Sequence, residues 1–331
     1  MIIESRAFAR AGLLGNPSDG YFGKTISIIV RNFGASVSLY ESPELRIEET
    51  EVDLNTFRNI YHLVDSVKLT GYYGGARLVK AAIKKFWEYC ETNHIKFTNK
   101  NFTIRYRTST PRQVGLAGSS AIITATIKAL MIFYDVKIPK HILPTLILKA
   151  ESEELGINAG LQDRVIQVYE GCVFMDFEKK HLEKNEYGKY ESIDPALLPK
   201  LYLAYKVELG KVSGTVLNNI REKYEKGDAL VHDTLDEIAS LAVQGRTAIL
   251  DRDYETLKKL MNLNFDLRCK IMDISPSNKE LVMAARECGA TAKFSGSGGA
   301  IIGTYEDDEM LQKLILTLKK INARVIKPII I

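Results

Sequence analysis

A run of small residues and hydroxyl groups, Pro111–Ala121, has the composition of a site that binds an anion. It contains two glycines, Gly115 and Gly118, and two adjacent serines. Glycine permits positive φ angles and lets a ligand approach the backbone, and serine hydroxyls reach a phosphate or a metal ion. The alternative interpretation is an ordinary glycine-containing turn, and this stretch alone does not distinguish the two.

The segments on either side of this run predict how it is held. Phe102–Thr108 alternates apolar and polar residues, as a half-buried strand does. Residues 121–134 are apolar and contain neither glycine nor proline, which predicts a buried helix. The order strand, glycine-rich loop, helix directs free backbone N–H groups and the positive end of a helix dipole at one place. That arrangement favours a phosphate site.

Two other phosphate-binding loops are excluded by spacing. A Walker A loop has four residues between its first glycine and its Gly-Lys-Ser/Thr, and residues 20–25 imitate it with the wrong spacing. The Gly-x-Gly-x-x-Gly signature of dinucleotide-binding folds is absent from this loop.

Three stretches in order resemble the motifs of the GHMP small-molecule kinases (galactokinase, homoserine kinase, mevalonate kinase and phosphomevalonate kinase). Residues 111–121 resemble the second motif and depart from it at Ala117, where the family has its middle glycine. We expect alanine to preserve the loop provided that the position does not need positive φ. Residues 9–19 resemble the first motif, with Asn16-Pro17 in place of Glu-His, and residues 292–300 resemble the third.

The resemblance implies an α+β, two-domain GHMP kinase fold. We expect a ribosomal protein S5 domain 2-like N-terminal domain over residues 1–195. We expect a ferredoxin-like C-terminal domain with a helical insert over residues 196–331. Further expectations, from pattern alone, are strands at 26–30 and 35–40, a helix at 53–67, an exposed connector at 179–190 and a helix at 253–265.

The same resemblance implies phosphoryl transfer from ATP with Mg²⁺, which needs charge neutralisation, alignment and an acceptor for the hydroxyl proton. Ser120 and Glu151 would hold Mg²⁺. Asp163 would act as the general base, and Arg10, close to it, would stabilise the transferring group. The residues expected to bind ATP are Pro111, Gly115, Leu116, Ala117, Gly118, Ser119, Ser120 and Ala121 in one loop and Gly296, Ser297 and Gly298 in the other.

Within the family, the motif variants are similar to those of plant-type glucuronokinases. The stretches that carry this are residues 13–19, 111–122, 160–164 and 261–268. The implied reaction converts ATP and D-glucuronate into ADP and 1-phospho-α-D-glucuronate. The carboxylate of a uronate needs a cation, for which Arg112 and Arg268 are the candidates, with Asp19 on the sugar hydroxyls. The alternative is that both arginines pair with acids of the protein.

Other interpretations stay open at this point. The substrate could be galacturonate, arabinose, galactose or a mevalonate-type alcohol, because sugar stereochemistry is recognised by a few contacts. A non-catalytic protein of GHMP fold is another class, although Ser120, Glu151, Asp163 and Lys293 are all kept. A nucleic-acid-binding role is disfavoured, because the net charge is only +4 and no dense basic run occurs.

Composition places the chain among ordinary globular proteins. Of its 331 residues, 46% are hydrophobic and 26% charged, and no apolar run reaches the length needed to span a membrane. The four cysteines are dispersed without metal-binding spacing, which favours reduced thiols. We therefore expect a cytoplasmic protein, a monomer or homodimer, that binds neither nucleic acid nor membrane. The resemblance implies ATP and a sugar acid as its partners.

Overall fold

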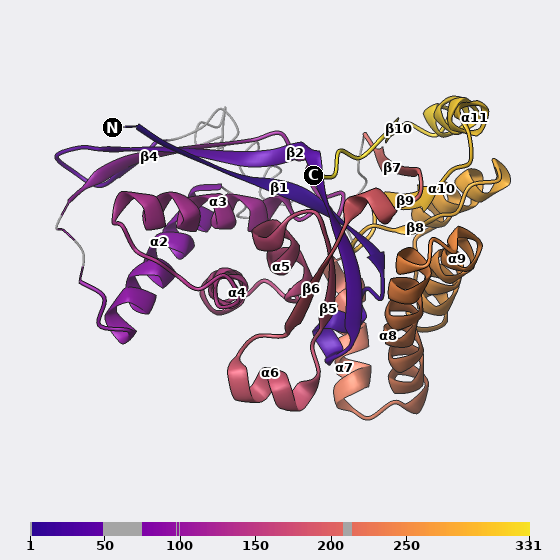
Figure 1. Cartoon of the computed structure of the whole chain (residues 1–331), viewed down its shortest axis with the longest axis horizontal. Helices are drawn as coiled ribbons and strands as arrows, with labels where there is room; N and C mark the ends of the chain where they lie inside the picture. The colour runs from indigo at the N-terminus through magenta and orange to yellow at the C-terminus, as the bar shows by residue number, and fades with distance from the viewer. Residues whose placement is uncertain (1, 49–74, 97, 99, 208–213) are drawn as a thin grey trace, which may run out of the picture. The chain divides into compact units, whose positions relative to one another are not determined.

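The computed structural model describes residues 2–48, 75–96, 98, 100–207 and 214–331 (Figure 1). The chain forms two compact units, each assembled from separate stretches. Unit 1 comprises Met1–Ala9, Phe33–Thr110 and Gly118–Val168, and unit 2 comprises Arg10–Asn32, Pro111–Ala117 and Tyr169–Ile331. The domain boundary expected between residues 195 and 196 remains a prediction. The helix expected at 53–67 lies outside the described residues.

Unit 1 combines part of a six-stranded sheet with packed helices. The strand β4 (Phe102–Thr108) pairs antiparallel with the end of β2 (Lys24–Glu41), and the short β3 (Arg46–Ile47) pairs in parallel with β4. The helices are α2 (Gly75–Thr92), α3 (Gly118–Phe133), α4 (Leu143–Leu155) and α5 (Gln162–Tyr169). Helix α2 packs against α3 and α4, and α3 also contacts β4. The strand predicted at 102–108 is therefore confirmed.

The first half of β2 continues the same sheet in unit 2. It pairs antiparallel with β5 (Cys172–Asp176), which in turn pairs with β6 (Lys189–Ile193). The strand β1 (Ile2–Leu14) also pairs with β2. Between β1 and β2 the short 3₁₀ helix η1 (Ser18–Tyr21) closes the turn.

The second sheet lies wholly in unit 2 and is antiparallel throughout. Its strands are β7 (Leu201–Lys206), β8 (Lys293–Phe294), β9 (Ala300–Thr304) and β10 (Ala323–Ile326). Their order β10-β7-β9-β8 is the fourth-first-third-second order of a ferredoxin-like sheet. Buried side chains from this sheet and its helices, including Tyr202, Phe265, Leu281, Phe294 and Leu314, form one core.

Helices fill the connections of this second sheet. Between β7 and β8 lie α7 (Gly214–Glu225), α8 (Ala229–Leu250), α9 (Tyr254–Ile271) and α10 (Pro276–Glu287), and α11 (Asp308–Lys319) precedes β10. Figure 1 shows α8 and α9 side by side as a long pair, in agreement with their extensive packing. The expected helical insert in a ferredoxin-like domain is confirmed by this order.

Several elements differ from their sequence-based expectations. The strands predicted at 26–30 and 35–40 form one strand, β2, because nothing between them turns the chain. Gly34 keeps that strand continuous, since a Cβ there would lie 2.7 Å from the carbonyl oxygen of Ala7. The connector predicted at 179–190 contains α6 (Lys179–Asn185), whose first turn is capped by Glu178. The helix predicted at 253–265 continues to Ile271.

Candidate active site

The glycine-rich loop ends at residue 117, because α3 begins at Gly118 rather than at Ala121. The two serines therefore lie on the first helical turn, where N–H groups have no partner within the helix. Left-handed residues alternate along the loop at Gln113, Gly115 and Ala117, with φ values of 57°, 69° and 58°. Alternation of this kind turns successive N–H groups inward and forms an anion-binding concavity.

We expected alanine at position 117 to preserve the loop only if that position did not need positive φ. The structure shows that Ala117 does take positive φ. A left-handed alanine costs on the order of 1–2 kcal/mol, since its Cβ crowds the backbone. The loop keeps its shape despite the substitution, so its surroundings hold the alanine in that conformation.

The two glycine-rich loops of unit 2 lie backbone against backbone. A Cβ added at Gly115 would stand 2.7 Å from the carbonyl oxygen of Gly298, and one at Gly296 would stand 2.2 Å from the carbonyl oxygen of Gly115. No side chain fits into either gap. The close packing of the second motif against the third therefore requires glycine at positions 115 and 296.

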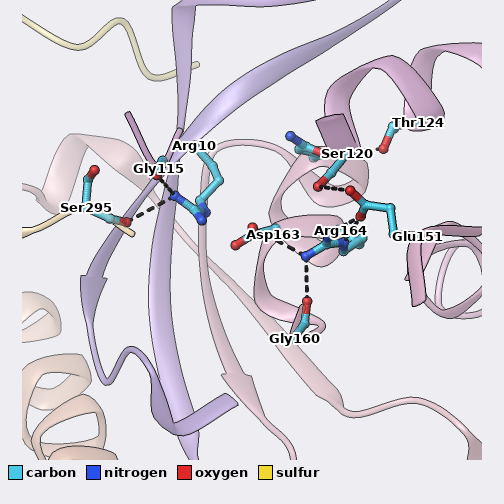
Figure 2. Close-up of polar contacts among 10 residues, drawn as sticks. Arg10, Gly115, Ser120, Thr124, Glu151, Gly160, Asp163, Arg164 and Ser295 are labelled. Carbon is cyan, nitrogen blue, oxygen red and sulfur yellow. Dashed lines mark hydrogen bonds and ion pairs between the residues drawn. The ribbon is translucent and has the colours of Figure 1, made fainter. Parts of the chain in front are cut away.

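Arg10, on β1, hydrogen-bonds to both glycine-rich loops. It is buried, and its Nη1 donates hydrogen bonds to the carbonyl oxygens of Gly115 at 2.6 Å and Ser295 at 3.2 Å (Figure 2). Its backbone N–H also donates to Leu116 at 3.3 Å. The first motif is thereby bound to the other two.

Arg268, on α9, hydrogen-bonds to the third motif. Its side chain is 0% exposed, its Nη1 donates to the carbonyl oxygen of Gly296 at 3.0 Å, and its guanidinium lies 5.2 Å from the centre of the Phe294 ring. Its Nη2 is buried without a hydrogen-bond partner. Burial lowers the pKa of Arg268 to about 10, so the group is charged at neutral pH.

Lys293, at the start of the third motif, reaches back to the first. Its Nζ donates to the carbonyl oxygens of Gly12 at 2.7 Å and Phe294 at 2.9 Å and to the side-chain oxygen of Asn16. Burial, with Arg268 and Arg10 nearby, holds the pKa of Lys293 well below its usual range. Three acceptors nevertheless match the three N–H groups of an ammonium, because a neutral amine would turn its lone pair toward an oxygen. We therefore assign the protonated form.

The Asn-Pro variant of the first motif has a structural reason. Asn16 accepts a hydrogen bond from Lys293, and Asn264 of α9 accepts one from Gly15 N at 2.9 Å and donates one to the carbonyl oxygen of Asn16 at 3.2 Å. Two of the stretches that distinguish this chain, 13–19 and 261–268, therefore hold one another in place.

Unit 1 carries the acidic residues of the candidate site. Glu151 on α4 faces Ser120 on α3, with 3.4 Å between Ser120 Oγ and Glu151 Oε1, and both side chains are buried. Arg164 on α5 donates from Nε to Glu151 Oε2 at 2.6 Å, and its Nη2 contacts the same oxygen (Figure 2). Arg164 Nη1 lies 3.4 Å from Asp163 Oδ2. The structure thus brings Ser120, Glu151 and Asp163 into one cluster around Arg164.

The remaining predicted residues are placed as follows. Arg112 is exposed on the loop, and Asp19 is half-buried in η1. Arg10 belongs to unit 2 and Asp163 to unit 1, so their proximity remains a prediction. Arg164 received no role from the sequence, because nothing local indicates that it pairs with Glu151. Its position beside a predicted base was the available signal.

Comparisons with known proteins agree with this architecture. The family model described as "GHMP kinases N terminal domain" matches residues 77–171, and that described as "GHMP kinases C terminal" matches residues 246–322. Glucuronokinase 1 of Arabidopsis thaliana is 46% identical over 306 residues, covering 91% of this chain and 84% of that protein. Probable glucuronokinase 2 of the same plant is 48% identical over 308 residues, with the same coverage.

A solved structure shows the same fold at low identity. Lactococcus lactis galactokinase complexed with galactose superimposes with a TM-score of 0.79 at 13% identity, covering 99% of this chain and 93% of that one. The chain therefore belongs to the GHMP kinase family and is a phosphotransferase. The predicted two-domain α+β fold and the resemblance to glucuronokinases are both confirmed.

Proposed function

We propose that this protein transfers the γ-phosphoryl group of ATP to the anomeric hydroxyl of D-glucuronate, giving 1-phospho-α-D-glucuronate and ADP. The observation that supports D-glucuronate as the substrate is the 46–48% identity to two glucuronokinases over 91% of the chain. The buried Ser120 and Glu151, with the partly exposed Asp163 beside them, support the chemistry, since phosphoryl transfer needs oxygen ligands for a cation and an acceptor for a proton.

In this proposal Asp163 accepts the proton of the attacking hydroxyl. Its side chain is 17% exposed, so a substrate can reach it, and its Oδ2 lies 3.4 Å from Arg164 Nη1. A positioned base of this kind contributes roughly 10²–10⁴-fold to the rate. Arg10 stabilises negative charge on the transferring group, because its guanidinium is fixed by two backbone acceptors.

The residues present fit a magnesium ion that shares its coordination with a nucleotide. Mg²⁺ prefers oxygen ligands and is usually held by one or two protein groups together with water and phosphate oxygens. Glu151 Oε1 and Ser120 Oγ supply two such oxygens. Within the described residues no group of three or more His, Cys, Asp or Glu is placed to hold a metal ion. When bound, Mg²⁺ neutralises charge on the phosphates.

Of the two candidate arginines, we propose Arg112 as the partner of the substrate carboxylate. It is exposed on the anion-binding loop, whereas Arg268 is fully buried, and its Nη1 donates to the carbonyl oxygen of Gly296. Asp19, half-buried in η1, is proposed to accept hydrogen bonds from sugar hydroxyls.

A cytoplasmic location is also proposed, on the strength of the four cysteines, which are all free thiols. In the described part of the chain no helix is both long and apolar enough to cross a bilayer.

The proposed activity is tested by coupled ADP release with ATP and Mg²⁺. The sugar panel is D-glucuronate, D-galacturonate, D-galactose, L-arabinose and mevalonate, and Asp163→Asn is assayed beside the wild type. We expect turnover with D-glucuronate that is lost in the variant. Turnover with a different sugar would keep the kinase and replace the substrate. No turnover across the panel, in a protein that binds ATP, would favour a non-catalytic role.

A further inference from the structure

The guanidinium of Arg164 joins three parts of the candidate active site in unit 1. It contacts Glu151 through Nε and Nη2, Asp163 through Nη1 at 3.4 Å, and the carbonyl oxygen of Gly160 through Nη1 at 2.8 Å (Figure 2). A guanidinium has five N–H donors in one rigid plane, so these contacts fix the directions of all three partners relative to one another.

The two oxygens of Glu151 have different neighbours. Arg164 takes Oε2 with two of its nitrogens, and Ser120 Oγ stands 3.4 Å from Oε1. The carboxylate cannot rotate without breaking both contacts to Arg164. Glu151 Oε1 is therefore directed toward the Ser120 hydroxyl, with which it would share the Mg²⁺ ion. Glu151 Oε2 is bound to Arg164 and would not contact that ion.

Burial makes this arrangement stiff. The side chains of Arg164 and Glu151 are 3% and 1% exposed, so water does not compete for their charges. The Asp163 carboxylate remains partly accessible beside them. The bond from Arg164 to Gly160 also fastens the loop that leads into α5, where Asp163 lies in the first turn.

We propose that Arg164 is a positioning residue that sets the geometry of both carboxylates: it orients Asp163 as the base and presents a single oxygen of Glu151 to the nucleotide-bound cation. This inference rests on the proposed kinase activity. An ion pair that served stability alone would need only Glu151. Arg164 also contacts the side chain of Asp163 and the carbonyl oxygen of Gly160.

A matched control exists in the same unit. Lys85 on α2 is also largely buried, with 11% of its side chain exposed. Its Nζ lies 2.6 Å from Glu153 Oε2 and 3.0 Å from Glu154 Oε1, both on α4. It has no part in the proposed chemistry. Loss of this cation breaks an ion cluster with two acids of the helix that carries Glu151, so it reports the effect of destabilisation without a change at the candidate active site.

The experiment compares the full-length wild type with Arg164→Met, Arg164→Lys and Lys85→Met. Steady-state assays with ATP, Mg²⁺ and D-glucuronate give kcat and both KM values. Calorimetry gives the Kd of ADP with and without Mg²⁺, which measures the site without turnover. Thermal unfolding gives the Tm of each variant.

We expect Arg164→Met to lower kcat at least about 100-fold with the KM for D-glucuronate within about threefold of wild type, because misplacement by an ångström costs this much. The gain in ADP affinity caused by Mg²⁺ should fall about 10-fold, as when other groups that orient metal ligands are removed. Lys85→Met should lower the Tm and leave kcat within about twofold, because its ion cluster lies outside the proposed chemistry.

A kcat of Arg164→Met near that of the wild type, or an equal loss in Lys85→Met, would overturn the proposal. If Arg164→Met does not fold, the Arg164→Lys variant is decisive. Lysine keeps the positive charge but lacks the planar set of N–H donors, so kcat should fall at least about 10-fold with an unchanged KM for D-glucuronate. Wild-type kcat in Arg164→Lys would overturn the proposal. If the wild type itself fails to phosphorylate D-glucuronate, the proposed function fails, and the ADP calorimetry still tests the role of Arg164 at Glu151.

Discussion

The ammonium of Lys293 donates a 2.7 Å hydrogen bond to the carbonyl oxygen of Gly12, joining the start of the third glycine-rich motif to the end of the first strand. The two residues are 281 positions apart in the chain. Both residues are buried, so the Lys293 ammonium takes the place of water as a donor to this carbonyl.

Lys293→Met should destabilise unit 2. The carbonyl oxygen of Gly12 and the side-chain oxygen of Asn16 would lose their ammonium donor, at about 1–3 kcal/mol for each acceptor left unsatisfied, and this outweighs the relief of repulsion from Arg10 and Arg268. Thermal unfolding measures the change. Lys279→Met is the control, because Lys279 is exposed in the same unit and its loss should change stability by less than about 0.5 kcal/mol. Equal Tm values for the two variants would contradict the prediction.

Ala117→Gly should stabilise the protein. Glycine removes the crowding of a left-handed alanine, about 1–2 kcal/mol, and this gain is offset by about 0.4–1 kcal/mol for the greater freedom of the unfolded chain. Gly115→Ala should have the opposite sign, because its Cβ would meet the carbonyl oxygen of Gly298. The Tm values of the two variants should therefore lie on opposite sides of the wild type, and a shift in the same direction would be inconsistent with the loop geometry.

Arg112→Ala should raise the KM for D-glucuronate at least about 10-fold, since a charged hydrogen bond to a carboxylate contributes about 1.5–3 kcal/mol. The KM for ATP serves as the internal control and should change little. Weakened binding of both substrates would assign Arg112 to the loop structure rather than to the carboxylate. An unchanged KM for the sugar acid would remove Arg112 from the substrate site.

The ion cluster between α2 and α4 predicts a loss of stability in acid. Hydrogen bonds from Lys84, then Lys85, hold the pKa of Glu154 below its usual value near 4.5, and the same two lysines lower the pKa of Glu88. A depressed folded-state pKa contributes stability above the unfolded pKa, and this stability is lost as pH falls below it. The difference in Tm between the wild type and Lys84→Met should therefore be present at pH 7 and shrink below pH about 4.5.

Lys80→Met is the control for this pH dependence. Lys80 is exposed on the same helix and lies outside the ion cluster. Its effect on Tm should be small and should not vary over the same pH range. A difference for Lys84→Met that persists unchanged in acid would show that Lys84 stabilises the helices by packing rather than by charge.

Local elements of the active site could be predicted because contiguous residues specify them. The strand at 102–108 and a helix beyond the glycine-rich loop follow from alternation and from an apolar run. The helix began three residues earlier than expected, because pattern does not reveal that Gly118 and the two serines supply its first turn. The break expected within β2 failed for a related reason: Gly34 marks a close approach by β1, not a turn.

The sequence by itself determined the family, the order of the three glycine-rich motifs and the residue types that phosphoryl transfer requires. These properties reside in short stretches whose spacing is readable along the chain. The tertiary structure alone decided which charges meet. Only folding could bring Lys293 to Gly12, Arg268 to Gly296 and Arg164 to Glu151, because a charged side chain takes its partner from whatever the fold places within about 3 Å.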